Sequence, residues 1–241
     1  MNNLVFEAVK NRLASSARTR ILAFGSSNTE RYLYGMHWFD VVNLGIREKY
    51  GSGKSHFINT GISGNTTADL LDRFQDDAAF YKPRLVFITI GGNDCNPLKN
   101  ISGRQFKENL EALHHKFSDM GTIVIFQTYY SPDPLQVDEE RLGNFYSCMD
   151  TVREVAAATK SGLIDHLRRW EPLRLAHNDR YLKMMLNGFH VNQIGNALLG
   201  LDILRSLDVA PGAAIPGNPF PALDEAVENQ KLMDSIGSEK N

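Results

Sequence analysis

The sequence predicts an α/β fold, a three-layer α/β/α sandwich with a five-stranded parallel sheet. Short apolar runs alternate with segments whose apolar residues recur at helical spacing, which is typical of consecutive βαβ units. The clearest run, 85–90, is rich in β-branched residues and is followed by two glycines, as expected of a parallel strand covered on both faces. Polar clusters follow several runs, and folds of this class bind ligands at the carboxyl ends of their strands.

The elements follow one another in a regular order from the N-terminus. Apolar spacing predicts a helix over 3–17, a compact strand over 20–25, and a second helix that contains Trp38 and ends near Gly51. The rest continue the alternation: strands 57–59 and 85–90, helix 103–119, strand 122–126, helix 138–160, strand 162–165 and a closing helix over 193–207. Such alternation implies right-handed crossovers in a flavodoxin-like sheet.

The chain is expected to form one α/β domain over 1–210 and a C-terminal arm over 211–241. Three prolines, Pro216, Pro219 and Pro221, interrupt the start of the arm, and a polar, helix-like tail follows them. We expect the arm to wrap the domain or to swap onto a second copy, which would give a homodimer.

Composition excludes several functional classes. The 241 residues are 42% hydrophobic with a formal net charge of −2 and no long basic run, which argues against a nucleic-acid partner. The two cysteines, Cys95 and Cys148, form neither a CxxC pair nor a metal-ligand pattern, and free thiols suit the cytoplasm. No signal peptide or apolar run long enough for a membrane span is recognisable. We therefore expect a cytoplasmic protein that acts on a small molecule.

Ser27 is the candidate nucleophile because Gly25-Ser26-Ser27-Asn28-Thr29 directly follows the first strand. A serine hydroxyl attacks only when a base accepts its proton. Of the seven histidines, His190 lies in a turn-rich loop just before the closing helix, on the last connection, and could return to the first strand. The alternative interpretation of Ser27 is a helix N-cap.

Three groups are candidate donors to a negatively charged oxygen. Gly64 allows an unusual backbone and close approach of a ligand, and Asn93 offers an amide directly after two glycines. The backbone N–H of Ser27, at an expected helix start, would be the third. With a nucleophile and a base these donors suffice for acyl transfer, and no metal or organic cofactor is needed.

Three further side chains are predicted to contact substrate because they follow strands at the same sheet edge. Tyr129 and Tyr130 come after the fourth strand, and Cys95 comes after Asn93. Cys95 is otherwise read as a small buried thiol. Asp94 is interpreted as a hydrogen-bond acceptor that holds the neighbouring loops.

On these four blocks the chain resembles the SGNH hydrolases, also called the GDSL esterase/lipase family. The four letters correspond here to Ser27, Gly64, Asn93 and His190. Each block alone is common in proteins, but four in this order are specific, and the resemblance covers roughly 18–207. It implies a serine esterase or acyl (or acetyl) hydrolase acting on a small ester.

Two positions depart from the family pattern. Ser26 stands where the first block normally has Asp, and Asn187 stands three residues before His190, where the fourth block normally has Asp. A carboxylate there orients the imidazole and stabilises the imidazolium, whereas an amide can only accept the ring N–H. Asn187 is therefore assigned a weak orienting role. Asp179, a backbone carbonyl, or deamidation of Asn187 beside Gly188 are the alternatives.

Two other functions compete with ester hydrolysis. A catalytically weak or inactive binding protein could have kept the pocket and lost the acid at position 187. A nucleotide-binding domain with the same kind of sheet is the second, but the first strand is followed by neither a Walker pattern nor Gly-x-Gly-x-x-Gly.

Overall fold

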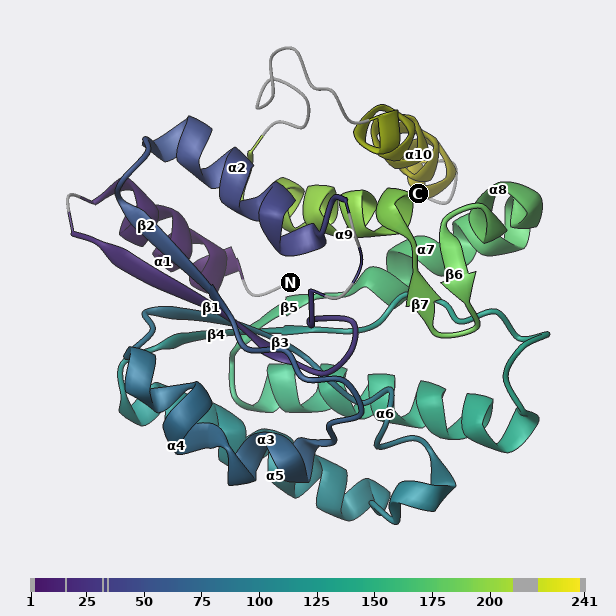
Figure 1. The fold of residues 1–241 in the computed structure, drawn as a ribbon, viewed down its shortest axis with the longest axis horizontal. Helices are drawn as coiled ribbons and strands as arrows, with labels where there is room; N and C mark the ends of the chain where they lie inside the picture. Colours follow the sequence, from purple (N-terminus) through teal and green to yellow (C-terminus); the bar gives the residue numbers. More distant parts are fainter. Residues whose placement is uncertain (1–2, 16, 32, 34, 210–220, 239–241) are drawn as a thin grey trace.

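The computed structural model describes residues 3–15, 17–31, 33, 35–209 and 221–238. Its centre is a five-stranded parallel sheet in the order β2-β1-β3-β4-β5 (Figure 1). The strands are β1 (Thr19–Gly25), β2 (Ser55–Asn59), β3 (Leu85–Thr89), β4 (Ile123–Gln127) and β5 (Gly162–Ile164). This order is that of flavodoxin-like sheets, and the predicted three-layer fold is confirmed.

Helices cover both faces of the sheet (Figure 1). One layer contains α1 (Asn3–Ala14), α2 (Trp38–Tyr50), α7 (His166–Ala176), α8 (Asn178–Leu182), α9 (Gln193–Ser206) and α10 (Pro221–Ser238). The other contains α3 (Thr67–Asp72), α4 (Phe74–Asp77), α5 (Gly103–Asp119) and α6 (Glu139–Ala158).

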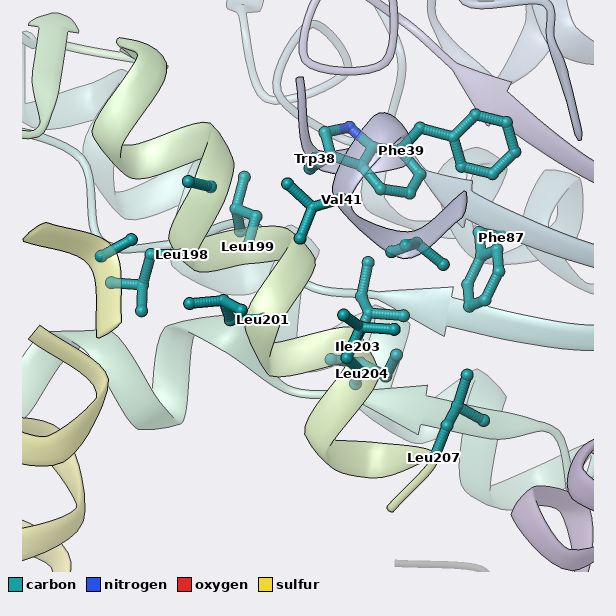
Figure 2. Close-up of a cluster of buried hydrophobic side chains, with 14 of the residues drawn as sticks. Trp38, Phe39, Val41, Phe87, Leu198, Leu199, Leu201, Ile203, Leu204 and Leu207 are labelled. Carbon is teal, nitrogen blue, oxygen red and sulfur yellow. The ribbon is translucent and has the colours of Figure 1, made fainter. Parts of the chain in front are cut away.

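Alternating side chains of the strands divide the core into two parts. In β1, Ile21 and Ala23 pack with the α2 and α9 layer, whereas Leu22 and Phe24 pack with the α3 to α6 layer. Every residue of β3 is buried, because both faces of this central strand are covered. Figure 2 shows the first part of the core, where leucines of α9 lie beside Trp38, Phe39 and Val41 of α2 and Phe87 of β3 belongs to the same cluster.

Several elements differ from the sequence prediction. The first helix ends at Ala14 rather than near residue 17, and α3, α4, α7 and α8 were not predicted. Helix α7 contains Pro172, a residue that ordinarily breaks helices, but its neighbours Trp170 and Leu173 are fully buried. Packing of these two side chains therefore outweighs the local cost of the proline.

The helical part of the predicted C-terminal arm belongs to the core of its own chain. Leu223, Ala226 and Met233 of α10 are buried in the same cluster as α9. The proline-rich start of the arm lies outside the described residues. Exchange of the arm between two copies stays a prediction.

A test of the packing between α2 and α9 is Gly200→Ala. A Cβ at this position would lie 2.5 Å from Val41 Cβ and 2.8 Å from the Trp38 carbonyl oxygen, so the two helices would have to separate. We expect a loss of about 1–3 kcal/mol in the free energy of unfolding, measured by chemical denaturation. The matched control is Gly143→Ala in α6, where a Cβ meets no atom within 4 Å, and helix propensity should stabilise it by up to about 1 kcal/mol. Equal stability of the two variants would contradict this account of the interface.

Candidate active site

Ser27 lies in a tight turn at the carboxyl end of β1. The backbone N–H groups of Thr29 and Glu30 both donate to the Ser26 carbonyl oxygen, each at 2.9 Å. Helix α2 begins only at Trp38, so the expectation that Ser27 stands at a helix start, either as an N-cap or as a helix-terminal donor, is wrong. The turn leaves Ser27 partly exposed while Ser26 and Thr29 beside it are buried.

His190 reaches Ser27 from a short antiparallel hairpin rather than from a simple loop. Strands β6 (Met185–Asn187) and β7 (His190–Val191) form this hairpin just before α9. The Ser27 Oγ lies 2.8 Å from His190 Nε2, and His190 Nδ1 lies 2.9 Å from Asn187 Oδ1. The structure thus brings together three of the predicted residues in one hydrogen-bonded chain. Asp179, the alternative acid, is exposed on α8.

The Asn187 side chain fixes which nitrogen of His190 carries the proton. Its Oδ1 accepts hydrogen bonds from the backbone N–H groups of Phe189 and His190, both at 3.0 Å. Because backbone N–H groups can only donate, the atom that faces them must be the amide oxygen, and His190 Nδ1 must donate to it as well. Nε2 is then the lone-pair nitrogen that faces the Ser27 hydroxyl, which is the arrangement a general base needs.

The surroundings of His190 favour a neutral ring. Burial is the main cause that lowers the pKa of His190 from its ordinary value, and the positive charge of Arg141 lowers it further. A neutral imidazole can accept a proton at neutral pH. The imidazolium that would follow has no neighbouring carboxylate in the Ser27-His190-Asn187 chain.

Gly64 and Asn93 lie on the loops that follow β2 and β3. Gly64 has a φ of 80°, which favours glycine, and a Cβ there would meet no atom within 4 Å, so the space before it is open. The Asn93 amide donates one N–H to the Asn65 carbonyl oxygen at 2.9 Å. Its second N–H remains available, because an amide nitrogen carries two hydrogens.

Arg73 ties the first two loops together and was missed from the sequence. Its Nε donates to Asn65 Oδ1 at 2.7 Å, its Nη1 to the Thr60 carbonyl oxygen at 2.7 Å, and its Nη2 to the Gly25 carbonyl oxygen at 3.0 Å. The guanidinium also lies 4.6 Å from the centre of the Phe24 ring. Its position between α3 and α4 gives no motif that could have identified it.

Asp94 binds the third loop to the start of α3. Its Oδ1 accepts from the backbone N–H of Thr67 at 2.8 Å and from the Thr67 hydroxyl at 2.6 Å. The Asn109 amide donates to the same hydroxyl oxygen at 3.0 Å. Asp94 is therefore an acceptor that holds loops, and burial raises the pKa of its carboxyl group.

Tyr129, Tyr130 and Cys95 are buried at this edge of the sheet, and their contact with substrate stays a prediction. Their exposed fractions are 3%, 2% and 1%. The Tyr129 hydroxyl lies 3.0 Å from the Ser26 hydroxyl, and burial raises the pKa of Tyr129 to about 12. Cys95 Sγ donates to the Gly92 carbonyl oxygen at 3.2 Å. The sequence predicted that these three residues lie at the carboxyl edge of the sheet, but it could not predict the direction of their side chains.

Across the part of the chain that the structure describes, no group of three or more His, Cys, Asp or Glu side chains is arranged to hold a metal ion. The groups at the sheet edge are a hydroxyl, an imidazole, amides and backbone N–H groups. Chemically, this set can deprotonate an alcohol and stabilise an oxyanion.

The sequence model of the GDSL-like Lipase/Acylhydrolase family matches residues 23–198, a range that contains Ser27, Gly64, Asn93 and His190. A curated relative, the uncharacterized lipoprotein YqeF of Bacillus subtilis (strain 168), is 34% identical over 101 residues. The matched part makes up 37% of this chain and 40% of the relative, so the chain spans less than half of that protein's length.

Two solved structures resemble the fold over nearly their whole length. The lipase/acylhydrolase from Enterococcus faecalis is 28% identical with a TM-score of 0.65, and the match covers 83% of this chain and 99% of that chain. An acetylxylan esterase from Geobacillus stearothermophilus is 20% identical with a TM-score of 0.70, covering 84% and 98%. At 20% identity, the second likeness concerns the fold alone.

The electrostatics of His190 can be tested without any substrate. NMR titration of the ring should give a pKa below 6.5, because burial and Arg141 both disfavour the charged form. A His190→Gln variant identifies the signal, and Arg141→Gln should move the pKa upward. A pKa above 6.5 that is unchanged in Arg141→Gln would show that neither cause operates.

Proposed function

Because the chain belongs to the GDSL-like Lipase/Acylhydrolase family, which places it among the ester hydrolases, we propose that it cleaves a small ester through Ser27 and His190. The observation that carries the proposal is the 2.8 Å contact between Ser27 Oγ and His190 Nε2, with Nδ1 bound to the Asn187 oxygen. The nucleophile, the base and the orienting group therefore form one chain of hydrogen bonds, which is the arrangement that serine hydrolases use.

In the proposed mechanism, Ser27 Oγ attacks the acyl carbonyl carbon while its proton passes to His190 Nε2. The negative oxygen that develops is bound by the backbone N–H groups of Ser27 and Gly64 and by the second N–H of Asn93. Collapse of this intermediate breaks the ester bond, and His190 gives its proton to the departing alcohol. Water then attacks the acyl-serine, with His190 again as base, and releases the acid.

Asn187 orients His190 without adding charge. In a serine protease, replacing the triad Asp by Asn lowers kcat by about 10⁴, which is attributed to the wrong histidine tautomer. Here the two backbone N–H groups hold the Asn187 oxygen toward the ring, so the tautomer is the useful one. We therefore expect a smaller loss that reflects only the missing negative charge.

Asn187 also favours a second candidate function, a binding protein with little or no turnover, because it stands where a carboxylate is expected. A fluorophosphonate probe distinguishes the two, because it labels only a serine that an adjacent base activates. Labelling at Ser27 that disappears in His190→Gln supports the hydrolase. An unlabelled, correctly folded protein supports the binding protein.

The proposed substrate class is a small acyl or acetyl ester. The relative from Enterococcus faecalis is described as a lipase/acylhydrolase, and the neighbour from Geobacillus stearothermophilus as an acetylxylan esterase. Among the described residues, no helix has the length and apolarity needed to cross a bilayer. Two buried free cysteines support the cytoplasm as the proposed location, and cell fractionation tests it against the membrane anchor that the word lipoprotein implies for the curated relative.

Ser27→Ala should remove turnover of a short p-nitrophenyl ester, lowering kcat by about 10³-fold or more, because it removes the hydroxyl that faces His190 Nε2 at 2.8 Å. The matched control is Ser147→Ala, an exposed serine on α6. Turnover at the original rate in Ser27→Ala would refute the proposed nucleophile.

Asn187→Asp should raise kcat by about tenfold, since a charge-assisted hydrogen bond to the imidazolium is about twice as strong as a neutral one. The acidic limb of the kcat/KM profile should also move to higher pH, because a carboxylate raises the pKa of His190. Peptide mass analysis of the original protein must show unmodified Asn187, so that deamidation does not mask the difference. If neither kcat nor the profile changes, another group orients the histidine.

A further inference from the structure

Arg141, in the first turn of α6, contacts both the β6–β7 hairpin that carries His190 and the loop that carries Asn93. Its guanidinium carbon is 4.3 Å from the centre of the Phe189 ring, and its Nη2 donates to the Gly92 carbonyl oxygen at 3.2 Å. Phe189 immediately precedes His190, and Gly92 immediately precedes Asn93. The proposed mechanism gives this cation no task.

The guanidinium has no acidic partner within 4.0 Å among the described residues. The arginines Arg73, Arg153 and Arg169, in comparison, pair with Asp side chains at 2.6–3.0 Å. The Nε of Arg141 is buried without a hydrogen-bond partner. A partly buried cation in this state is costly unless a ligand supplies the missing charge.

None of the described acids that neighbour Arg141 or Cys95 in the sequence forms an ion pair with Arg141 within 4.0 Å. Asp138 caps α6 through the backbone N–H of Arg141 at 2.8 Å, and the next two residues of that turn, Glu139 and Glu140, are exposed. Asp94 accepts from Thr67 through Oδ1, while its Oδ2 is buried without a hydrogen-bond partner, and the carboxylate lies more than 4.0 Å from the nitrogens of Arg141.

Glu30, which lines the same pocket as Ser27, accepts hydrogen bonds through its carboxylate from the backbone N–H of Ser63 at 2.8 Å and from the Ser63 hydroxyl. The two positions where the resemblance leads one to expect an acid hold Ser26 and Asn187. The site therefore combines one uncompensated cation with a histidine that must become positive during catalysis.

We propose that the ester cleaved here carries a carboxylate and that Arg141 binds this carboxylate beside His190. This inference rests on the proposed function and specifies its substrate class. The bound carboxylate would pair with the guanidinium, hold the ester between the His190 and Asn93 loops, and place near the imidazolium the negative charge that Asn187 lacks. A neutral ester of the same size gains none of these contacts.

The test compares pairs of esters in which one member carries a carboxylate and the other a neutral group at the same position. On the acyl side the pair is mono-p-nitrophenyl glutarate and p-nitrophenyl valerate, and on the alcohol side it is 4-acetoxybenzoate and 4-acetoxybenzamide. We expect kcat/KM to favour the carboxylate in at least one pair by about tenfold or more. Arg141→Gln should abolish that preference, and Arg141→Lys should keep part of it. The matched control Arg104→Gln, on an exposed α5 arginine paired with Glu108, should keep all of it.

The outcomes separate the two levels of the proposal. Turnover that depends on Ser27 but shows no carboxylate preference, or a preference unchanged in Arg141→Gln, overturns the role of Arg141 and leaves the esterase intact. If no ester is cleaved, the esterase proposal fails. Binding of a carboxylate then tests whether Arg141 forms the proposed site. In Ser27→Ala, added glutarate should raise the NMR-measured pKa of His190 with Arg141 present and leave it unchanged in the Arg141→Gln double variant. No glutarate effect in either protein overturns the carboxylate site.

Discussion

Hydrogen bonds to the Phe189 carbonyl oxygen hold the site together. The Asn28 amide donates to this oxygen at 3.2 Å, and the Tyr130 hydroxyl, which lies 2.7 Å from it and 2.7 Å from Asn28 Oδ1, shares its one proton between these acceptors. The bridge joins the turn after β1 to the hairpin before α9, and so helps to fix His190 relative to Ser27. Tyr130 is buried and its ring packs against that of Trp170, so the bridge is anchored in the core.

The loops around this bridge are held by polar groups that satisfy one another, because buried donors and acceptors are costly when unpaired. Arg73 donates two hydrogen bonds to the loop after β2 and one to the last residue of β1, and Asp94 connects the loop after β3 to α3. Most side chains at the sheet edge thus support the loops. At least three features are left for a ligand. They are the Ser27 hydroxyl, which contacts His190, the second N–H of Asn93, and the open space beside Gly64.

At His190, hydrogen bonds to a neutral amide take the place of a negatively charged orienting group. The Asn187 oxygen is held by two backbone N–H groups and in turn holds His190 Nδ1, so orientation is secured while the ring has no anionic neighbour in that chain. Arg141 adds a positive charge and lowers the pKa of His190 in the same direction as burial. In such a site the ring is neutral and available as a base near neutral pH, but the lowered pKa makes it a weaker base and the resulting imidazolium is poorly stabilised. A negative charge on the proposed anionic substrate would stabilise that imidazolium.

The sequence alone determined the sheet, its covered strands and the four blocks at its carboxyl edge, because hydrophobic periodicity and turn residues are local properties. It did not reveal α7, since Pro172 argues locally against a helix and only the burial of Trp170 and Leu173 favours one. Nor could it orient Tyr129, Tyr130 and Cys95, or identify Arg73 and Arg141, whose partners are distant in the chain. Local pattern specifies which elements form, whereas the direction of a side chain and the state of its charge depend on neighbours that only the tertiary structure brings near.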